Sequence, residues 1–483
     1  MKAPFPPKTT LAILTFAGLI LLPTVAPALK NYQTLDWHNI PDLFDFPLRD
    51  RTPTKTPEPL AEEKERLKPT APTKVEGPKN LLDPSRSLDH FYASLLNTEQ
   101  GKAGGVTRVL HYGDSPTTAD LITADARAML QKKYGDAGHG FVLIGRPWAW
   151  YGHRGIEITS ANWKIDPATT PEIKDGLYGL GGVSFRGGPG AMARLTLKDR
   201  KHTEVEIAYL AQPGGGTFTV EADTADVALG STDTDSETKG PAFVKYPLPA
   251  DTKNITIRVK SGNVRLYGAS LTKDTPGIVY NSLGLNGAYV SVLARMFNAQ
   301  HWTEELRHYD PDLVIVNYGT NESVYPKFLD SAYEKEMKEI VRRLRGALPR
   351  ASILVMSPMD RGQRESGGHI GTVAVMPRLI ALEQQVALET NCAFFNTFEA
   401  MGGLGTMGRW YEAEPRLVGA DFIHPMPAGA KIVGNLLYDA LVTGYNQYKL
   451  RHLQQRLSGG SKAESNASNV GPAKAGPTAK PSP

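Results

Sequence analysis

The chain has 483 residues but only one cysteine, Cys392, so it cannot close a disulfide bond within itself. No grouping of cysteine and histidine has the spacing of a zinc site. The net charge is only +4, from 54 basic and 50 acidic side chains, which argues against nucleic acid as a partner. Hydrophobic residues make up 41% and charged residues 22%, as in ordinary globular proteins. The fold must therefore be stabilised by the burial of apolar side chains.

The two ends of the chain differ in composition from the body. Residues 1–30 contain two lysines ahead of an apolar run that Pro23 and Pro27 interrupt, which predicts an export signal, either cleaved or kept as a membrane anchor. Residues 31–80 are rich in proline and in charges of both signs, as in an extended linker. Residues 458–483 offer little to bury and are predicted to form a disordered tail. We expect a periplasmic or extracellular protein, anchored to the inner membrane where the signal is kept.

Strand and helix patterns alternate in two stretches, residues 81–145 and 274–457. In the first stretch, the β-rich run from Val106 to Tyr112 precedes a helical pattern from Thr118 to Tyr134. In the second stretch we expect strands at 278–280, 313–316, 353–356 and 393–395, and helices at 289–297, 332–348, 377–390 and 428–441. This alternation predicts an α/β fold in which helices cover both faces of a parallel sheet.

The middle of the chain, residues 146–273, has a different pattern. Apolar and polar residues alternate there in short runs separated by Gly, Pro, Asp and Asn. The expected strands lie at 193–197, 204–210, 217–221, 242–246, 255–259 and 264–271. The pattern predicts a β-sandwich or jelly roll inserted into a surface loop of the α/β domain.

Ser115 directly follows the first expected strand and precedes the first expected helix. Open α/β sheets bind their ligands at this edge, where the carboxyl ends of the strands lie. A serine at this position is otherwise a helix cap or a turn residue. Because an unactivated hydroxyl is a weak nucleophile, a catalytic role requires a base and a group that orients the base.

Three Asp-x-x-His strings supply candidate bases, and they end at His139, His202 and His424. His139 follows the first helix and should lie at the opposite edge of the sheet from Ser115. His202 lies in a charged turn that we expect to be solvated. His424 follows the last strand, at the same edge as Ser115, and Asp421 can orient its imidazole. The pair also fits a helix-capping aspartate beside a hydrogen-bonded histidine.

An attacked acyl group develops a negative oxygen that needs hydrogen-bond donors. Two turns at the same edge of the sheet offer such donors. The turn from Asn281 to Gly287 can present the Gly287 amide, and the turn from Gly319 to Glu322 can present the Asn321 side chain. Each turn alone is an ordinary Gly/Asn turn, but together with Ser115 they predict one shared pocket.

These motifs resemble the four sequence blocks of the SGNH (GDSL-type) hydrolases. The blocks are Gly113-Asp114-Ser115, Gly287, Gly319-Thr320-Asn321 and Asp421-Phe422-Ile423-His424. The resemblance covers about residues 81–145 and 277–448, without the middle region or the ends. It implies a flavodoxin-like three-layer fold and ester hydrolysis without a metal or other cofactor.

The resemblance also implies a role for each matched residue. Ser115 would be the nucleophile and one oxyanion donor, with Gly287 and Asn321 as the other two donors. His424 would be the base and Asp421 its orienting partner. The chain departs from the family pattern at two positions, where Pro116 replaces leucine and Glu322 replaces the commoner aspartate.

A narrower resemblance comes from the strings His111–Ser115 and Gly135–Gly140, together with the export signal and the inserted β region. These features are similar to those of periplasmic SGNH proteins that include peptidoglycan O-acetylesterases, whose insert resembles a carbohydrate-binding module. We expect an exported serine esterase that removes O-acetyl groups from a cell-envelope or extracellular glycan, with peptidoglycan as one candidate. The alternatives are a glycan O-acetyltransferase with the same triad and a non-catalytic glycan-binding envelope protein.

Overall fold

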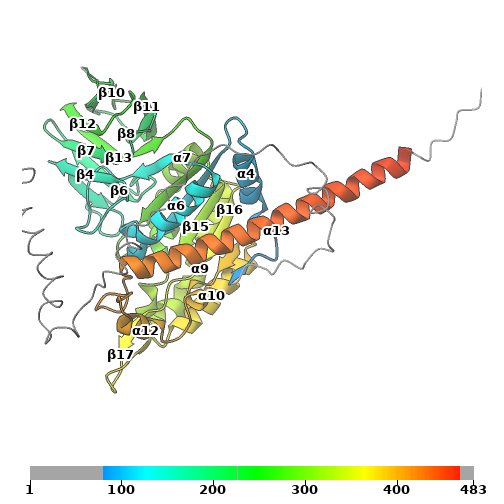
Figure 1. The fold of residues 1–483 in the computed structure, drawn as a ribbon. Coiled ribbons are helices and arrows are strands. Elements are labelled where there is room, and N and C mark those ends of the chain that lie inside the picture. The colour runs from blue at the N-terminus through cyan, green and yellow to red at the C-terminus, as the bar shows by residue number, and fades with distance from the viewer. Residues whose placement is uncertain (1–79, 226, 468–483) are drawn as a thin grey trace, which may run out of the picture. The chain divides into compact units, whose positions relative to one another are not determined.

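The computed structural model describes residues 80–225 and 227–467 (Figure 1). The expected signal or anchor at 1–30, nearly all of the expected linker and residues 468–483 lie outside the described residues. Within the described part, every helix is too short or too polar to span a bilayer.

A six-stranded sheet carries the α/β part of the fold. Its order is β1-β19-β16-β15-β2-β14, and all neighbours are parallel except β1 and β19. The strands are β1 (Leu81–Leu82), β2 (Val106–Gly113), β14 (Gly277–Gly284), β15 (Leu313–Asn317), β16 (Ser352–Met356) and β19 (Ala393–Phe395). Read along the chain, the parallel strands have the order 2-1-3-4-5, which is the flavodoxin-like order. The predicted α/β class is confirmed.

Helices cover both faces of this sheet (Figure 1). They are α4 (Asp89–Glu99), α6 (Leu121–Tyr134), α7 (Ala299–Tyr309), α9 (Glu334–Ala347), α10 (Met376–Glu389) and α13 (Pro427–Ala467). In β15, Val314 belongs to one hydrophobic core with Ile340 of α9, and Ile315 belongs to a second core with Leu437 of α13. Successive side chains of a strand therefore enter opposite layers, which explains why the buried strands are apolar throughout.

Eleven strands between α6 and β14 form two antiparallel sheets. One sheet has the order β10-β9-β12-β7-β4, with β4 (Ile156–Ala161), β7 (Met192–Leu197), β9 (Thr217–Ala222), β10 (Gly230–Asp233) and β12 (Asn254–Ser261). The other has the order β11-β8-β13-β6-β5, with β5 (Lys164–Pro167), β6 (Val183–Gly187), β8 (Glu204–Ala211), β11 (Gly240–Pro247) and β13 (Val264–Thr272). Buried side chains of both sheets, such as Ile257 and Ile207, belong to one core.

The second of these sheets begins earlier in the chain than expected. Strand β3 (Gly138–Val142) pairs with β13, although we placed its residues in the α/β stretch that ends at residue 145. Gly138 and Gly140 have positive φ angles of 119° and 73°, and both lie too close to neighbouring atoms for a Cβ. The strand is short and irregular, so it gave no alternating pattern.

The helix predicted at 289–297 is present but irregular. Residues 290–296 are helical, the segment η3 (Val292–Met296) within them is a π-helical turn, and α7 follows it before β15. Arg343 of α9 donates hydrogen bonds to the carbonyls of Leu293 and Phe297, and so it supplies partners for the irregular turn. Asn298 then starts α7 by accepting a hydrogen bond from the His301 amide.

The last helix is longer than predicted. We expected it to end at Leu441 and a disordered tail to begin at Ser458, but α13 extends from Pro427 to Ala467. Tyr445 is fully buried, and its hydroxyl donates to Glu99 of α4 at 2.5 Å. Lys449 pairs with the same carboxylate at 3.0 Å. Packing against α4 thus continues the helix beyond the apolar stretch that defined our prediction.

Candidate functional site

Ser115 lies at the sharp junction between β2 and the short helix α5 (Ser115–Thr118). Its exposed fraction is 9%. A Cβ on Gly113 would lie 2.2 Å from the Thr117 hydroxyl oxygen, so only glycine allows the chain to turn this closely. The turn places the Ser115 hydroxyl at the carboxyl edge of the parallel sheet, as predicted.

The structure brings Ser115, His424 and Asp421 into one hydrogen-bonded row. His424 Nε2 lies 2.8 Å from Ser115 Oγ, and His424 Nδ1 lies 2.6 Å from Asp421 Oδ2. A carboxylate can only accept, so Nδ1 carries the imidazole proton and Nε2 accepts from the serine hydroxyl. This arrangement gives the hydroxyl a base and the base an orienting partner.

Asp421 is held in its ionised form. Burial raises the pKa of Asp421. Hydrogen bonds from the His424 side chain and from the Ile423 and His424 amides lower it by a larger amount, so the pKa lies below its usual value. The Asp421 and His424 side chains are each 47% exposed. Water can therefore reach the imidazole.

The loop that carries His424 is fixed by its own backbone. The Gly419 amide donates to the His424 carbonyl at 2.8 Å, and the Gly362 amide donates to the Phe422 carbonyl at 2.9 Å. Phe422 has a φ of 60°, and its ring packs edge-on against Tyr411. Asp421 also accepts from the amide two residues on, which is the usual hydrogen bond of an Asx turn.

The two predicted oxyanion donors lie in the turns on either side of Ser115, because β14 and β15 flank β2 in the sheet. The Asn321 side-chain amide donates to the Ala288 carbonyl at 2.8 Å, which leaves its second hydrogen for another acceptor. Gly287 is exposed and has a φ of 69°. No atom lies within 4 Å of a Cβ placed there, so the positive φ, and not crowding, is what favours glycine.

Glu322, which stands where aspartate is commoner, joins these two turns. Its side chain is fully buried, and its two oxygens accept from the Val290 amide at 2.7 Å and the Gly319 amide at 3.1 Å. Burial raises the pKa of Glu322 to about 8, although these hydrogen bonds lower it. Burial likewise raises the pKa of Asp114, beside the nucleophile, to about 7.

Arg361 is a site residue that sequence reasoning missed. It follows β16, and its Nη1 donates to the Thr320 carbonyl at 2.6 Å. Burial lowers the pKa of Arg361, whereas the nearby Asp114 and Asp421 raise it. Its place after a parallel strand was the one available signal, because that edge also carries Ser115.

The other two candidate histidines are not part of this row. His139 and His202 stack with ring centroids 5.0 Å apart, and His153 lies 5.2 Å from His139. We expected His202 in a solvated turn, but only 3% of it is exposed. Lys273 pairs with Asp199 and draws the charged turn inward.

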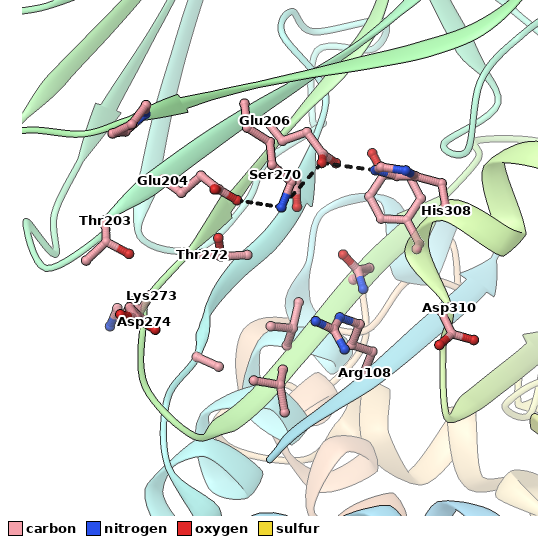
Figure 2. A pocket seen from close by; sticks show the side chains of 17 residues that line it. Arg108, Thr203, Glu204, Glu206, Ser270, Thr272, Lys273, Asp274, His308 and Asp310 are labelled. Atoms are coloured by element: carbon pink, nitrogen blue, oxygen red, sulfur yellow. Dashed lines mark hydrogen bonds and ion pairs between the residues drawn. The ribbon is translucent and has the colours of Figure 1, made fainter. Parts of the chain in front are cut away.

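A separate cavity of about 630 Å³ lies between the β8-β13 sheet and the amino ends of β2 and β14 (Figure 2). Four of its titratable side chains pair with one another. Lys245 lies 2.9 Å from Glu204, and His308 lies 3.0 Å from Glu206. Arg108, on β2, lies on the wall of this cavity, at the opposite end of β2 from Ser115.

No group of three or more His, Cys, Asp or Glu side chains in residues 80–225 and 227–467 is arranged to hold a metal ion.

The chain is similar to known proteins in part of its sequence and in its fold. Residues 254–432 match the model of the GDSL-like Lipase/Acylhydrolase family, a range that includes Gly287, Asn321, Asp421 and His424 but not Ser115. A solved structure described as a peptidoglycan O-acetylesterase in action is 24% identical, covers 76% of this chain and 99% of its own, and superposes with a TM-score of 0.65. A family two carbohydrate esterase from Clostridium thermocellum is 11% identical over 60% of this chain and 100% of its own, with a TM-score of 0.26. No curated protein matches.

Proposed function

We propose that the chain is an esterase with a GDSL-like lipase/acylhydrolase domain, and that it removes O-acetyl groups from a cell-envelope or extracellular glycan with Ser115 as nucleophile. The observation that carries this proposal is the hydrogen-bonded row from Asp421 through His424 to Ser115. Such a row is the known means of activating a serine hydroxyl for acyl transfer.

In the first half of the reaction, the Ser115 oxygen attacks the acetyl carbonyl carbon while His424 Nε2 takes the hydroxyl proton. The carbonyl electrons move to oxygen and form a tetrahedral oxyanion. Asp421 stabilises the imidazolium through Nδ1. His424 then gives its proton to the leaving sugar oxygen, and acetyl-Ser115 remains.

The second half of the reaction hydrolyses the acetyl-enzyme. His424 takes a proton from water, the resulting oxygen attacks the acetyl carbonyl, and the proton passes to Ser115 as acetate leaves. The 47% exposure of the His424 side chain supports hydrolysis, since water can reach Nε2.

The proposed oxyanion donors are the amides of Ser115 and Gly287 and the side chain of Asn321. The proposal is supported by their position in turns that flank β2, and by the free hydrogen on the Asn321 amide. Donors fixed before the reaction stabilise the developing charge without reorganisation.

The substrate class is proposed from three features taken together. The structure of similar fold is described as a peptidoglycan O-acetylesterase. Residues 1–30 have the pattern of an export signal. The strands from β3 to β13 form two antiparallel sheets, which we propose to be an inserted β-sandwich domain. We propose that an acetylated glycan is the binding partner of the protein.

The proposal is tested by measuring acetate release from O-acetylated peptidoglycan and from O-acetylated neutral oligosaccharides. Wild type and the control Ser160→Ala, on the exposed side of β4, should release acetate. Ser115→Ala should release none. Equal release by wild type and Ser115→Ala would refute the proposal, and label transferred to a sugar hydroxyl would identify a transferase.

A further inference from the structure

A groove of about 740 Å³ lies beside the candidate site and has no role in the steps above. One wall begins at Tyr289, two residues after Gly287. The other wall contains Tyr325 and Phe328, which follow Asn321. The groove therefore adjoins both turns that carry the proposed oxyanion donors, and a ligand held in it would extend from the reacting ester.

The groove has an aromatic wall. The Tyr289 ring lies 5.9 Å from the Tyr325 ring and 6.4 Å from the Phe328 ring. Tyr325 is 53% exposed, which is high for a large aromatic side chain. Burial and a hydrogen bond with Tyr325 raise the pKa of Tyr289 to about 12, so its hydroxyl keeps its proton at neutral pH. Flat apolar faces beside phenol donors suit a sugar ring, which has an apolar face and a polar edge.

The charges of the groove all have one sign. Its lining contains Arg295 and Lys327 and no acidic side chain. Arg295 is paired with Glu336 at 2.8 Å, whereas Lys327 has no ion pair within the described residues. A groove that offers cations without acids favours a ligand that carries negative charge.

Arg361 is not a lining residue of the groove but lies beside the segment that forms one of its walls. Its Nη1 donates to the Thr320 carbonyl at 2.6 Å and lies 3.4 Å from Ser323 Oγ, two residues before Tyr325. Burial lowers the pKa of Arg361, although Tyr289, Tyr325 and Asp421 lie near enough to raise that pKa by a smaller amount. Nη2 and Nε have no hydrogen-bond partner in residues 80–225 and 227–467, so two donors remain for a carboxylate.

We propose that this groove binds a sugar that bears a carboxylate, with the ring against Tyr325 and the carboxylate on Arg361. This inference rests on the proposed function, because the same glycan presents its ester to Ser115. The carboxylate can come from a lactyl ether, as in muramic acid, or from a uronic acid. In either case, the enzyme selects acidic O-acetylated glycans over neutral ones.

The test compares kcat/KM for acetate release from three substrates: an O-acetylated muramic acid oligosaccharide with a free lactyl carboxylate, an O-acetylated oligouronate and an O-acetylated neutral cello-oligosaccharide. Wild type should prefer at least one acidic substrate by about tenfold, as expected for one charged hydrogen bond. Added salt should reduce that preference, because it screens the charges. The favoured acidic substrate identifies the source of the carboxylate.

Arg361→Gln should reduce the acidic-to-neutral ratio to near one, mainly through KM, and Arg361→Lys should restore part of it. Tyr325→Ala should raise KM for all three glycans. The matched control is Arg342→Gln, since Arg342 is exposed and pairs with Glu339 on α9. Should Arg361→Gln fail to fold, Lys327→Gln, on the exposed rim, reports the same charge dependence.

Failure of the groove proposal and failure of the proposed function give different results. A wild type that releases acetate from every glycan in a Ser115-dependent way, with equal kcat/KM for acidic and neutral substrates, would overturn the groove proposal alone. An unchanged ratio in Arg361→Gln would do the same. Acetate release from none of the glycans would overturn the proposed function.

Discussion

The Glu322 carboxyl accepts a hydrogen bond from the Val290 amide at 2.7 Å, across the space between two turns of the site. Its other oxygen accepts from the Gly319 amide at 3.1 Å. The turn that contains Gly287 and the turn that contains Asn321 are thereby fixed to one buried group. The position of one proposed oxyanion donor depends on that of the other.

Replacement of Glu322 by alanine should lower both stability and turnover. It leaves two buried amides without acceptors, at a cost of about 1–3 kcal/mol each. We expect a large loss in the free energy of unfolding, measured with urea, and a fall in kcat as the two turns loosen. Glu339→Ala, on the outer face of α9, is the control and should change stability by no more than about 0.5 kcal/mol. Equal stabilities of the two variants would contradict the linking role of Glu322.

The strands and the hydrogen-bonded row of Asp421, His424 and Ser115 were predictable because both depend on local pattern and on the direction of the chain. Val314 and Ile315 belong to an apolar run that only a sheet covered on both faces can bury. Ser115 and His424 both lie after a parallel strand and before a helix, which predicts that they share one edge of the sheet. The catalytic role of this row stays a prediction, although its hydrogen bonds are in place.

The features that the sequence did not reveal depend on distant partners. The π-helical turn at Leu293 has its carbonyl bonded by Arg343, fifty residues away. The extension of α13 depends on Tyr445 meeting Glu99 of α4. Arg361 belongs to the site through the Thr320 carbonyl, a backbone atom that no side-chain motif describes. Such contacts have no local signature in the sequence.

Asp421→Asn should lower kcat by about four orders of magnitude with little change in KM, by analogy with the corresponding change in a serine protease. An amide can present its NH2 group to Nδ1, which favours the tautomer with a proton on Nε2 and removes the acceptor for Ser115. Steady-state kinetics on an acetyl ester measure the loss. Asp439→Asn, on the exposed side of α13, should behave as wild type. A loss below tenfold would show that Asp421 does not set the tautomer.

Asn321→Ala should reduce kcat by about 10²- to 10³-fold, the usual cost of one oxyanion donor. The variant also loses the hydrogen bond to the Ala288 carbonyl, so a thermal melt must accompany the kinetics. Asn97→Ala, which removes an exposed hydrogen bond with Lys102, controls for the loss of an amide side chain. A change confined to KM would assign Asn321 to substrate binding instead of transition-state stabilisation.

The histidines His139, His153 and His202 should make stability depend on pH. Burial, followed by the charge of Arg127, lowers the pKa of His153 to about 3, against about 6.5 in an unfolded chain. The nearby Asp120 acts in the opposite direction. Because the folded state holds fewer protons, His153 destabilises the fold as pH falls below about 6.5, and this effect ends only near the folded pKa.

His153→Asn should therefore weaken the loss of stability between pH 7 and pH 5 by about 2 kcal/mol, since the unfolded chain no longer takes up that proton. The buried Asp114 and Glu322 have raised pKa values and act oppositely, because the folded state keeps their protons as the unfolded state loses them. Asp114 and Glu322 are the same in wild type and variant, so their contribution cancels when the two free energies of unfolding are subtracted. Urea unfolding at both pH values provides the measurement, with His369→Gln as an exposed control. If the free energy of unfolding falls with pH by the same amount in wild type and His153→Asn, then His153 takes up its proton as readily in the folded state as in the unfolded one.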